Sequence, residues 1–160
     1  MLEVIGNQYL ALKNVICGTY TVYSNETALA IENFYKNLEK FSVTPTGELV
    51  YSILSDLEEE PLLIRFYLPV KEDLVEFSTE NNNFMFQSYF LIRNTLKIRY
   101  EIDSESVDKA ITSSKELTQI AYAELIKYSA ENDLEILTNF YHTQKLVNNK
   151  WYEEISVGIK

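Results

Sequence analysis

The sequence predicts a mixed α+β fold with an antiparallel sheet, and three observations carry this prediction. Short runs rich in β-branched and aromatic residues indicate strands, and two longer segments place apolar residues at helical spacing. The order strand, helix, strand, strand occurs twice along the chain. The length of 160 residues suits one domain. We therefore expect a single domain over residues 1–160, built from two duplicated halves of about 1–80 and 84–160, with both main helices on one face of the sheet.

The first half is predicted to contain four strands and one helix. The strands are expected at residues 9–12, 15–23, 49–54 and 62–70. Ser24 offers an N-cap for a helix that runs from Glu26 to Phe41. The apolar residues of this helix recur every three or four positions, which predicts an amphipathic helix. They are Ala28, Ile31, Tyr35, Leu38 and Phe41.

The second half repeats this order after a polar loop at residues 81–83. Its strands are expected at residues 84–93, 96–102, 136–146 and 151–159. A helix capped by Ser104 or Ser106 is expected to end near Ala130, and Asn148 and Asn149 predict a turn before the last strand.

The composition indicates which classes of partner the protein does not bind and in which cellular compartment it is expected. The net charge is −10, and the 14 basic residues are scattered among 24 acidic ones. Nucleic-acid and membrane-surface binding both rest on clustered Lys and Arg, so we predict neither nucleic acid nor membrane as a partner. The single cysteine, Cys17, cannot form an intrachain disulfide, and the first residues do not resemble a signal peptide. These features predict a cytoplasmic protein.

No motif for catalysis, metal or cofactor binding is apparent. One histidine, His142, and one cysteine give no ligand spacing for zinc, and four glycines cannot supply a phosphate-binding loop. We predict no catalytic residue, no metal and no cofactor.

Candidate ligand-binding residues come from the alternation of side chains along the closing strand of each half. Arg65 and Tyr67 share one face in the first half, and Glu154 lies on the equivalent face in the second. The opposite face of the last strand, with Ile155, Val157 and Ile159, is expected to carry the helices. Arg65 and Glu154 could pair, or Glu154 could bind a cationic ligand between aromatic rings. A plain solvated sheet face with a surface ion pair is the structural alternative. The predicted aromatic walls are Tyr20, Tyr51, Tyr67, Tyr100 and Trp151.

Three short segments resemble the gyrase-inhibitor-like (GyrI-like) domain, the effector-binding domain found at the C terminus of some bacterial transcription activators. The segments are Cys17-Gly18-Thr19-Tyr20, Ile64-Arg65-Phe66-Tyr67-Leu68-Pro69-Val70 and Trp151-Tyr152-Glu153-Glu154-Ile155-Ser156-Val157. The resemblance implies a cleft between the halves, lined by aromatic residues and a buried Glu, that binds small and often cationic or amphiphilic molecules. Some members are described as hydrolases.

The chain departs from that family's pattern in two places. Lys97-Ile98-Arg99-Tyr100 stands where a Gly-x-Tyr is expected, and Gly158 replaces the usual Pro. These departures indicate a lost or reshaped cleft, and a stand-alone branch of the family that acts with a protein partner would show them too.

Two functions follow as hypotheses. The first is a non-catalytic binding module for a small-molecule effector, cationic or amphiphilic, and the second is a protein-interaction module with a filled cleft and a protein partner. A hydrolase in which Glu154 activates water is left open, although a non-catalytic role is favoured.

Overall fold

The computed structural model describes residues 2–77, 83–102 and 115–160. The predicted α+β class is confirmed, and the order strand, helix, strand, strand occurs twice. The first half contains β1 (Val4–Val22), α1 (Thr27–Leu38), β2 (Val50–Ile53) and β3 (Leu62–Pro69), with the short 3-10 helices η1 (Ser24–Glu26) and η2 (Glu39–Phe41) beside α1. The second half contains β4 (Phe84–Ile102), α3 (Lys115–Glu131), β5 (Ile136–Val147) and β6 (Lys150–Ile159). The predicted caps Ser104 and Ser106 lie outside the described residues.

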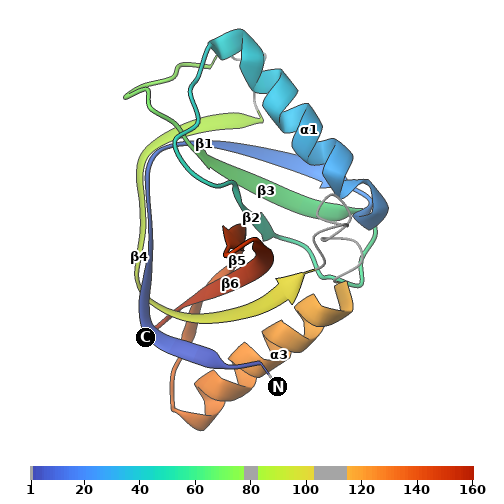
Figure 1. Cartoon of the computed structure of the whole chain (residues 1–160), viewed down its shortest axis with the longest axis vertical. Helices are drawn as coiled ribbons and strands as arrows, with labels where there is room; N and C mark the ends of the chain where they lie inside the picture. Colours follow the sequence, from blue (N-terminus) through green and yellow to red (C-terminus); the bar gives the residue numbers. More distant parts are fainter. Residues whose placement is uncertain (1, 78–82, 103–114) are drawn as a thin grey trace.

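The six strands form a closed antiparallel barrel in the order β1-β3-β2-β5-β6-β4 (Figure 1). The halves meet at two seams, where β1 pairs with β4 and β2 pairs with β5. Each strand therefore has two neighbours, and closure removes the free edges on which a partner strand could be added. The antiparallel sheet was predicted, and its closure into a barrel is an additional finding.

Each half starts with one long strand where the sequence predicts two. β1 and β4 run side by side and bend around one side of the molecule (Figure 1). The β1–β4 register shifts between Ile5 and Leu10, and Asn7 and Asn14 have positive φ angles of 55° and 54°. A bulge bends a strand without ending it, and asparagine tolerates the left-handed conformation, so the polar residues that suggested a break are bends within β1.

The sheet has two faces with different contents. We call the side that carries both helices the helix face, and the side that encloses the barrel interior the barrel face. On the helix face, α1 packs over β1 and β3, and α3 packs over β4 and β6. A smaller apolar cluster fills part of the barrel face and contains Val15, Cys17, Val50 and Tyr67.

Helix α1 buries only part of the predicted stripe: Leu38 is buried, and Ile31 and Phe41 pack partly buried against the core. Ala30, Phe34 and Leu38 are buried, whereas Tyr35 is 39% exposed. Gly18 makes this orientation fit, because a Cβ atom there would lie 2.7 Å from the Phe34 ring. Ser24 does not cap α1; it begins η1, and its hydroxyl donates to Glu60.

Two features of the last hairpin explain local sequence choices. Asn148 and Asn149 have positive φ angles of 51° and 64°, as a two-residue hairpin turn requires. The Gly158 N–H donates to the Thr138 hydroxyl at 2.7 Å. The proline expected by family resemblance could not make this bond.

Within the described ranges, no helix is long and apolar enough to cross a membrane.

Candidate functional site

A buried polar cluster lies on the helix face where the two halves meet. Its centre is Glu153 on β6, whose side chain is 1% exposed. The Tyr51 hydroxyl donates a hydrogen bond to Glu153 Oε1, and His142 Nδ1 lies 3.1 Å from the same oxygen. The Tyr122 hydroxyl in turn bonds His142 Nε2. If Nδ1 carries the proton and Nε2 accepts from Tyr122, a neutral imidazole satisfies both contacts.

The strand register brings these residues together. Tyr51 on β2 is paired with His142 on β5 across the seam between the halves, and their rings stack with centroids 4.6 Å apart. His142 is paired with Ile155 on β6, two positions from Glu153 on the same face. Helix α3, which packs on the helix face, contributes Tyr122. The cluster is therefore assembled only when both halves dock.

The electrostatics of the cluster favour proton donors around one carboxylate. Burial, together with the charge of Glu153, raises the pKa of Tyr51 well above its usual value. Burial also raises the pKa of Tyr122. Both hydroxyls stay protonated at neutral pH and can donate. Glu153 Oε2 is buried and has no hydrogen-bond partner among the described residues, although a buried carboxylate oxygen normally has one.

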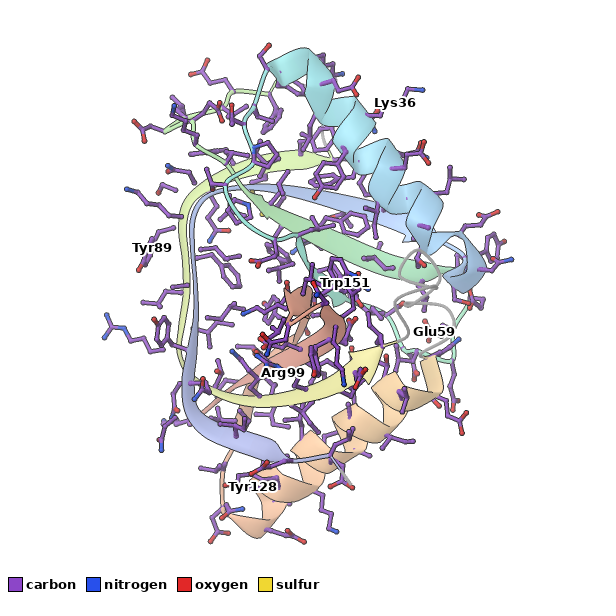
Figure 2. The ribbon with its side chains drawn as sticks, in the orientation of Figure 1. Lys36, Glu59, Tyr89, Arg99, Tyr128 and Trp151 are labelled. Atoms are coloured by element: carbon purple, nitrogen blue, oxygen red, sulfur yellow. The ribbon has the colours of Figure 1, made fainter. Side chains whose placement is uncertain are left out.

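Hollows lie on both sides of Tyr51. One has a volume of about 250 Å³ and is bordered by α1, the segment entering β2, and the β5–β6 hairpin. Its walls are Ile31, Tyr35, Glu48, Leu49, Tyr51, Gln144 and Trp151. The other, of about 10 Å³, lies between Tyr51, Lys115 and Thr118. Figure 2 shows Trp151 near the middle of the molecule, at the start of β6.

The structure brings two of the predicted wall residues, Tyr51 and Trp151, to one hollow. Tyr20 packs instead against Phe34 in the first helix-face cluster, where its hydroxyl accepts a hydrogen bond from Asn37. Tyr100 is buried in the second cluster, with its hydroxyl 3.3 Å from that of Thr118.

The remaining predicted residues, Arg65, Tyr67 and Glu154, lie on the barrel face. Arg65 does not reach Glu154; its Nε donates to the Thr19 hydroxyl. Tyr67 packs in the barrel-face cluster, in edge contact with Tyr141. Glu154 meets no aromatic cage. The ammonium groups of Lys97 and Lys145 lie 3.4 and 3.3 Å from its Oε1, and Arg99 Nε donates to its Oε2 at 2.8 Å. Ligand binding by these three residues stays a prediction.

Sequence reasoning passed over Glu153, although a signal was present. Glu153 falls on the same face as Ile155, Val157 and Ile159, the stripe expected to carry the helices. Burying a carboxylate beside an apolar stripe costs free energy unless the carboxylate has polar partners, so its presence predicts a buried polar cluster at this position. The sequence near His142 gives no sign of its contact with Glu153, because the two residues lie on different strands.

Among the residues that the structure describes, no three His, Cys, Asp or Glu side chains gather closely enough to hold a metal ion.

Comparisons with known proteins identify a family and a fold. The family described as Domain of unknown function (DUF5085) matches residues 11–160. No curated protein matches the chain. The crystal structure of the EcmrR C-terminal domain superposes with a TM-score of 0.67 at 13% identity, over 100% of this chain and 98% of that one. The cryo-EM structure of an EcmrR–DNA complex gives a TM-score of 0.69 at 13% identity.

The chain spans 57% of the length of EcmrR in that complex and 99% of its own length. The chain therefore has the fold of the EcmrR C-terminal domain, which supports the predicted resemblance at the level of the fold. The exclusion of nucleic acid from the partners is wrong, because this fold occurs in a protein solved in complex with DNA. The cytoplasmic location stays a prediction.

Proposed function

Because this chain belongs to the family described as Domain of unknown function (DUF5085), which names no activity, we propose a function from the site itself: a binding module for a small cationic or amphiphilic molecule. The carrying observation is the buried carboxylate Glu153: its Oε2 has no partner among the described residues, and its Oε1 accepts from Tyr51, a wall of the aromatic hollow. The GyrI-like resemblance supports the same ligand class. A stand-alone branch of that class stays a prediction.

The walls of the hollow suit a cation with an apolar body. Tyr35, Tyr51 and Trp151 offer ring faces that attract cations within about 6 Å. Glu48 adds a second carboxylate at the exposed rim. The chain's net charge of −10 also favours a positive ligand over a negative one at long range.

Tyr51 would act as the gate to Glu153. Its ring borders both hollows, and its hydroxyl occupies one oxygen of the carboxylate. A rotation of this side chain would join the hollows and expose Glu153 to the ligand. The enlarged space would approach the volumes of several hundred Å³ that are usual for small-molecule sites. The open hollow favours this function over the protein-interaction alternative with a filled cleft.

The test is a thermal-shift and calorimetric titration with octyltrimethylammonium and phenyltrimethylammonium, using octanoate as the anionic counterpart. A ligand that binds only the folded state raises the melting temperature. We expect the ammonium compounds to bind the wild type, and Glu153→Gln to weaken binding by about tenfold or more. Glu154→Gln, on the other face, is the matched control and should leave this binding unchanged. Equal binding to wild type and Glu153→Gln, or no binding by either cation, would overturn the proposal.

A further inference from the structure

A second cavity opens on the barrel face, opposite the helix-face hollow. It has a volume of about 530 Å³ and is bordered by β1, the segment that enters β2, and strands β4, β5 and β6. Its apolar wall includes Leu10, Leu12 and Val50, and its polar wall includes Lys97, Lys145 and Glu154. The backbone of β6 separates it from Glu153, because side chains of adjacent residues point to opposite faces.

The charge at this cavity is positive in an otherwise acidic protein. Three cations, Lys97, Arg99 and Lys145, converge on the single carboxylate of Glu154. The cluster around Glu154 therefore sums to +2, against a net charge of −10 for the whole chain. The charged residues that line the cavity itself sum to +1; they are Lys13, Lys97, Lys145, Glu48 and Glu154. Holding three like charges around one counterion costs repulsion that a further anion would relieve.

The three cations have different positions relative to the cavity. Arg99 is fixed away from it: the guanidinium bonds Glu154 Oε2 and lies over the Tyr152 ring, 5.5 Å from its centroid. Figure 2 shows Arg99 on the side of β4 that faces the barrel interior. Lys97 and Lys145 border the cavity and contact the other oxygen, Oε1. Arg99 alone can therefore neutralise the Glu154 carboxylate, and Lys97 and Lys145 are positioned to contact a ligand in the cavity.

The lysines can contact Glu154 and a ligand together. Their side chains are 20% and 35% exposed, whereas that of Glu154 is 2% exposed. An ammonium group carries three donors, and the contact with Glu154 occupies one of them. Ser156 and Tyr141 border the same cavity and add hydroxyl groups. Burial, reinforced by Tyr67, raises the pKa of Tyr141 to about 12, so this hydroxyl remains a donor at neutral pH.

We propose that the barrel-face cavity binds a small organic anion, a carboxylate or phosphate held by Lys97 and Lys145, with its apolar body against Leu10, Leu12 and Val50. The cavity volume of about 530 Å³ fits a small organic molecule rather than a bare ion. Lys97 and Arg99 belong to the segment Lys97-Ile98-Arg99-Tyr100, in which the chain departs from the family pattern. That departure therefore supplies two of the three cations. The proposal is independent of the cation site on the helix face.

The effect of neutralising Glu154 distinguishes an anion site from a cation site. It competes with the anion for the same two ammonium groups, so its neutralisation should strengthen anion binding. A cation site built on Glu154 would respond in the opposite direction.

The experiment is isothermal titration of the full chain with phenyl phosphate, phenylacetate and inorganic phosphate at low salt. We expect phenyl phosphate and phenylacetate to bind more tightly than inorganic phosphate, since only they fill the apolar wall. Lys97→Gln and Lys145→Gln should each weaken binding by about threefold to tenfold, and the double variant should weaken it further. Lys36→Gln, an exposed residue on α1, changes the net charge equally and should leave binding unchanged.

Glu154→Gln should bind the same anions about threefold to tenfold more tightly. Near-ultraviolet circular dichroism verifies the fold of each variant, and the single lysine variants keep the test decisive if the double variant unfolds. Binding that is equal in wild type, Lys97→Gln and Lys145→Gln would overturn the proposal. So would weaker binding by folded Glu154→Gln, or no binding of any of the three anions.

Discussion

Glu153 and Glu154 are neighbours on β6, yet they lie in opposite surroundings. Glu153 is on the helix face in contact with Tyr51 and His142, and one of its oxygens has no partner within the described part of the chain. Glu154 is on the barrel face among three cations. One peptide bond thus separates a carboxylate with an unpartnered oxygen in the described part of the chain from a carboxylate that three cations contact. The difference shows that the face of a strand, rather than position in sequence, decides what a charged residue can bind.

The largest expected effect is on stability when the charge of Glu154 is removed. Glu154→Gln leaves Lys97, Arg99 and Lys145 close together without a counterion, and we expect a loss of about 2 kcal/mol in the free energy of unfolding. The value is below that for a fully buried pair because the cations are partly exposed. Glu153→Gln keeps an oxygen that accepts from Tyr51 and His142, so its loss should stay below about 1 kcal/mol. Urea unfolding measures both, and equal losses would contradict the contrast between the two sites.

The second expected effect concerns the hydroxyl that holds Glu153. Tyr51→Phe removes a hydrogen bond to a buried carboxylate and should cost about 1–2 kcal/mol at neutral pH. Tyr23→Phe is the matched control, since Tyr23 is 54% exposed, and its effect should lie within about 0.5 kcal/mol. A loss for Tyr51→Phe no larger than the control would mean that the hydroxyl contributes nothing to holding Glu153.

Much of this arrangement was predictable from local sequence. The strand and helix order follows from apolar periodicity, and the strand β6 stripe of Ile155, Val157 and Ile159 was assigned to its correct face. The turn at Asn148 and Asn149 follows from the tolerance of asparagine for positive φ. These signals act over a few residues and need no knowledge of the rest of the chain.

Barrel closure and the two sites were not predictable in the same way. The seam that joins Tyr51 to His142 pairs residues 91 positions apart, and no local signal encodes that pairing. The exact rotation of α1 decides whether Tyr35 enters the core or the hollow, and it depends on the close approach of Phe34 to Gly18. The cations around Glu154 come from β4 and β5, so only the sheet register reveals them.

A smaller effect is expected in the acid range. Burial alone would raise the pKa of Glu154, but Arg99, Lys97 and Lys145 outweigh it and hold the pKa below the ordinary value of 4.5. The unfolded chain therefore takes up this proton at a higher pH than the folded one. The stability contributed by Glu154 is complete above about pH 4.5 and is lost as the pH falls through the folded pKa.

Urea unfolding of wild type and Glu154→Gln at a series of pH values between neutrality and acid checks this dependence. The stability difference between the two proteins should shrink as the pH falls, because the wild type becomes uncharged at the same position. A difference that stays constant through the acid range would show that the three cations do not act on the carboxylate charge.

The last prediction tests whether the barrel is closed at the end that holds Cys17. Cys17 lies in the barrel-face apolar cluster with Val15 and Tyr67; it does not line the cavity beside Glu154, and it is 3% exposed. Burial raises the pKa of its thiol to about 11 against the opposing influence of Arg65, so little thiolate exists at pH 8. Labelling by a disulfide reagent should be about a hundredfold slower in the native protein than in urea. Rapid native labelling would mean that this end of the barrel opens as well, and an anion held by Lys97 and Lys145 could then enter from either side.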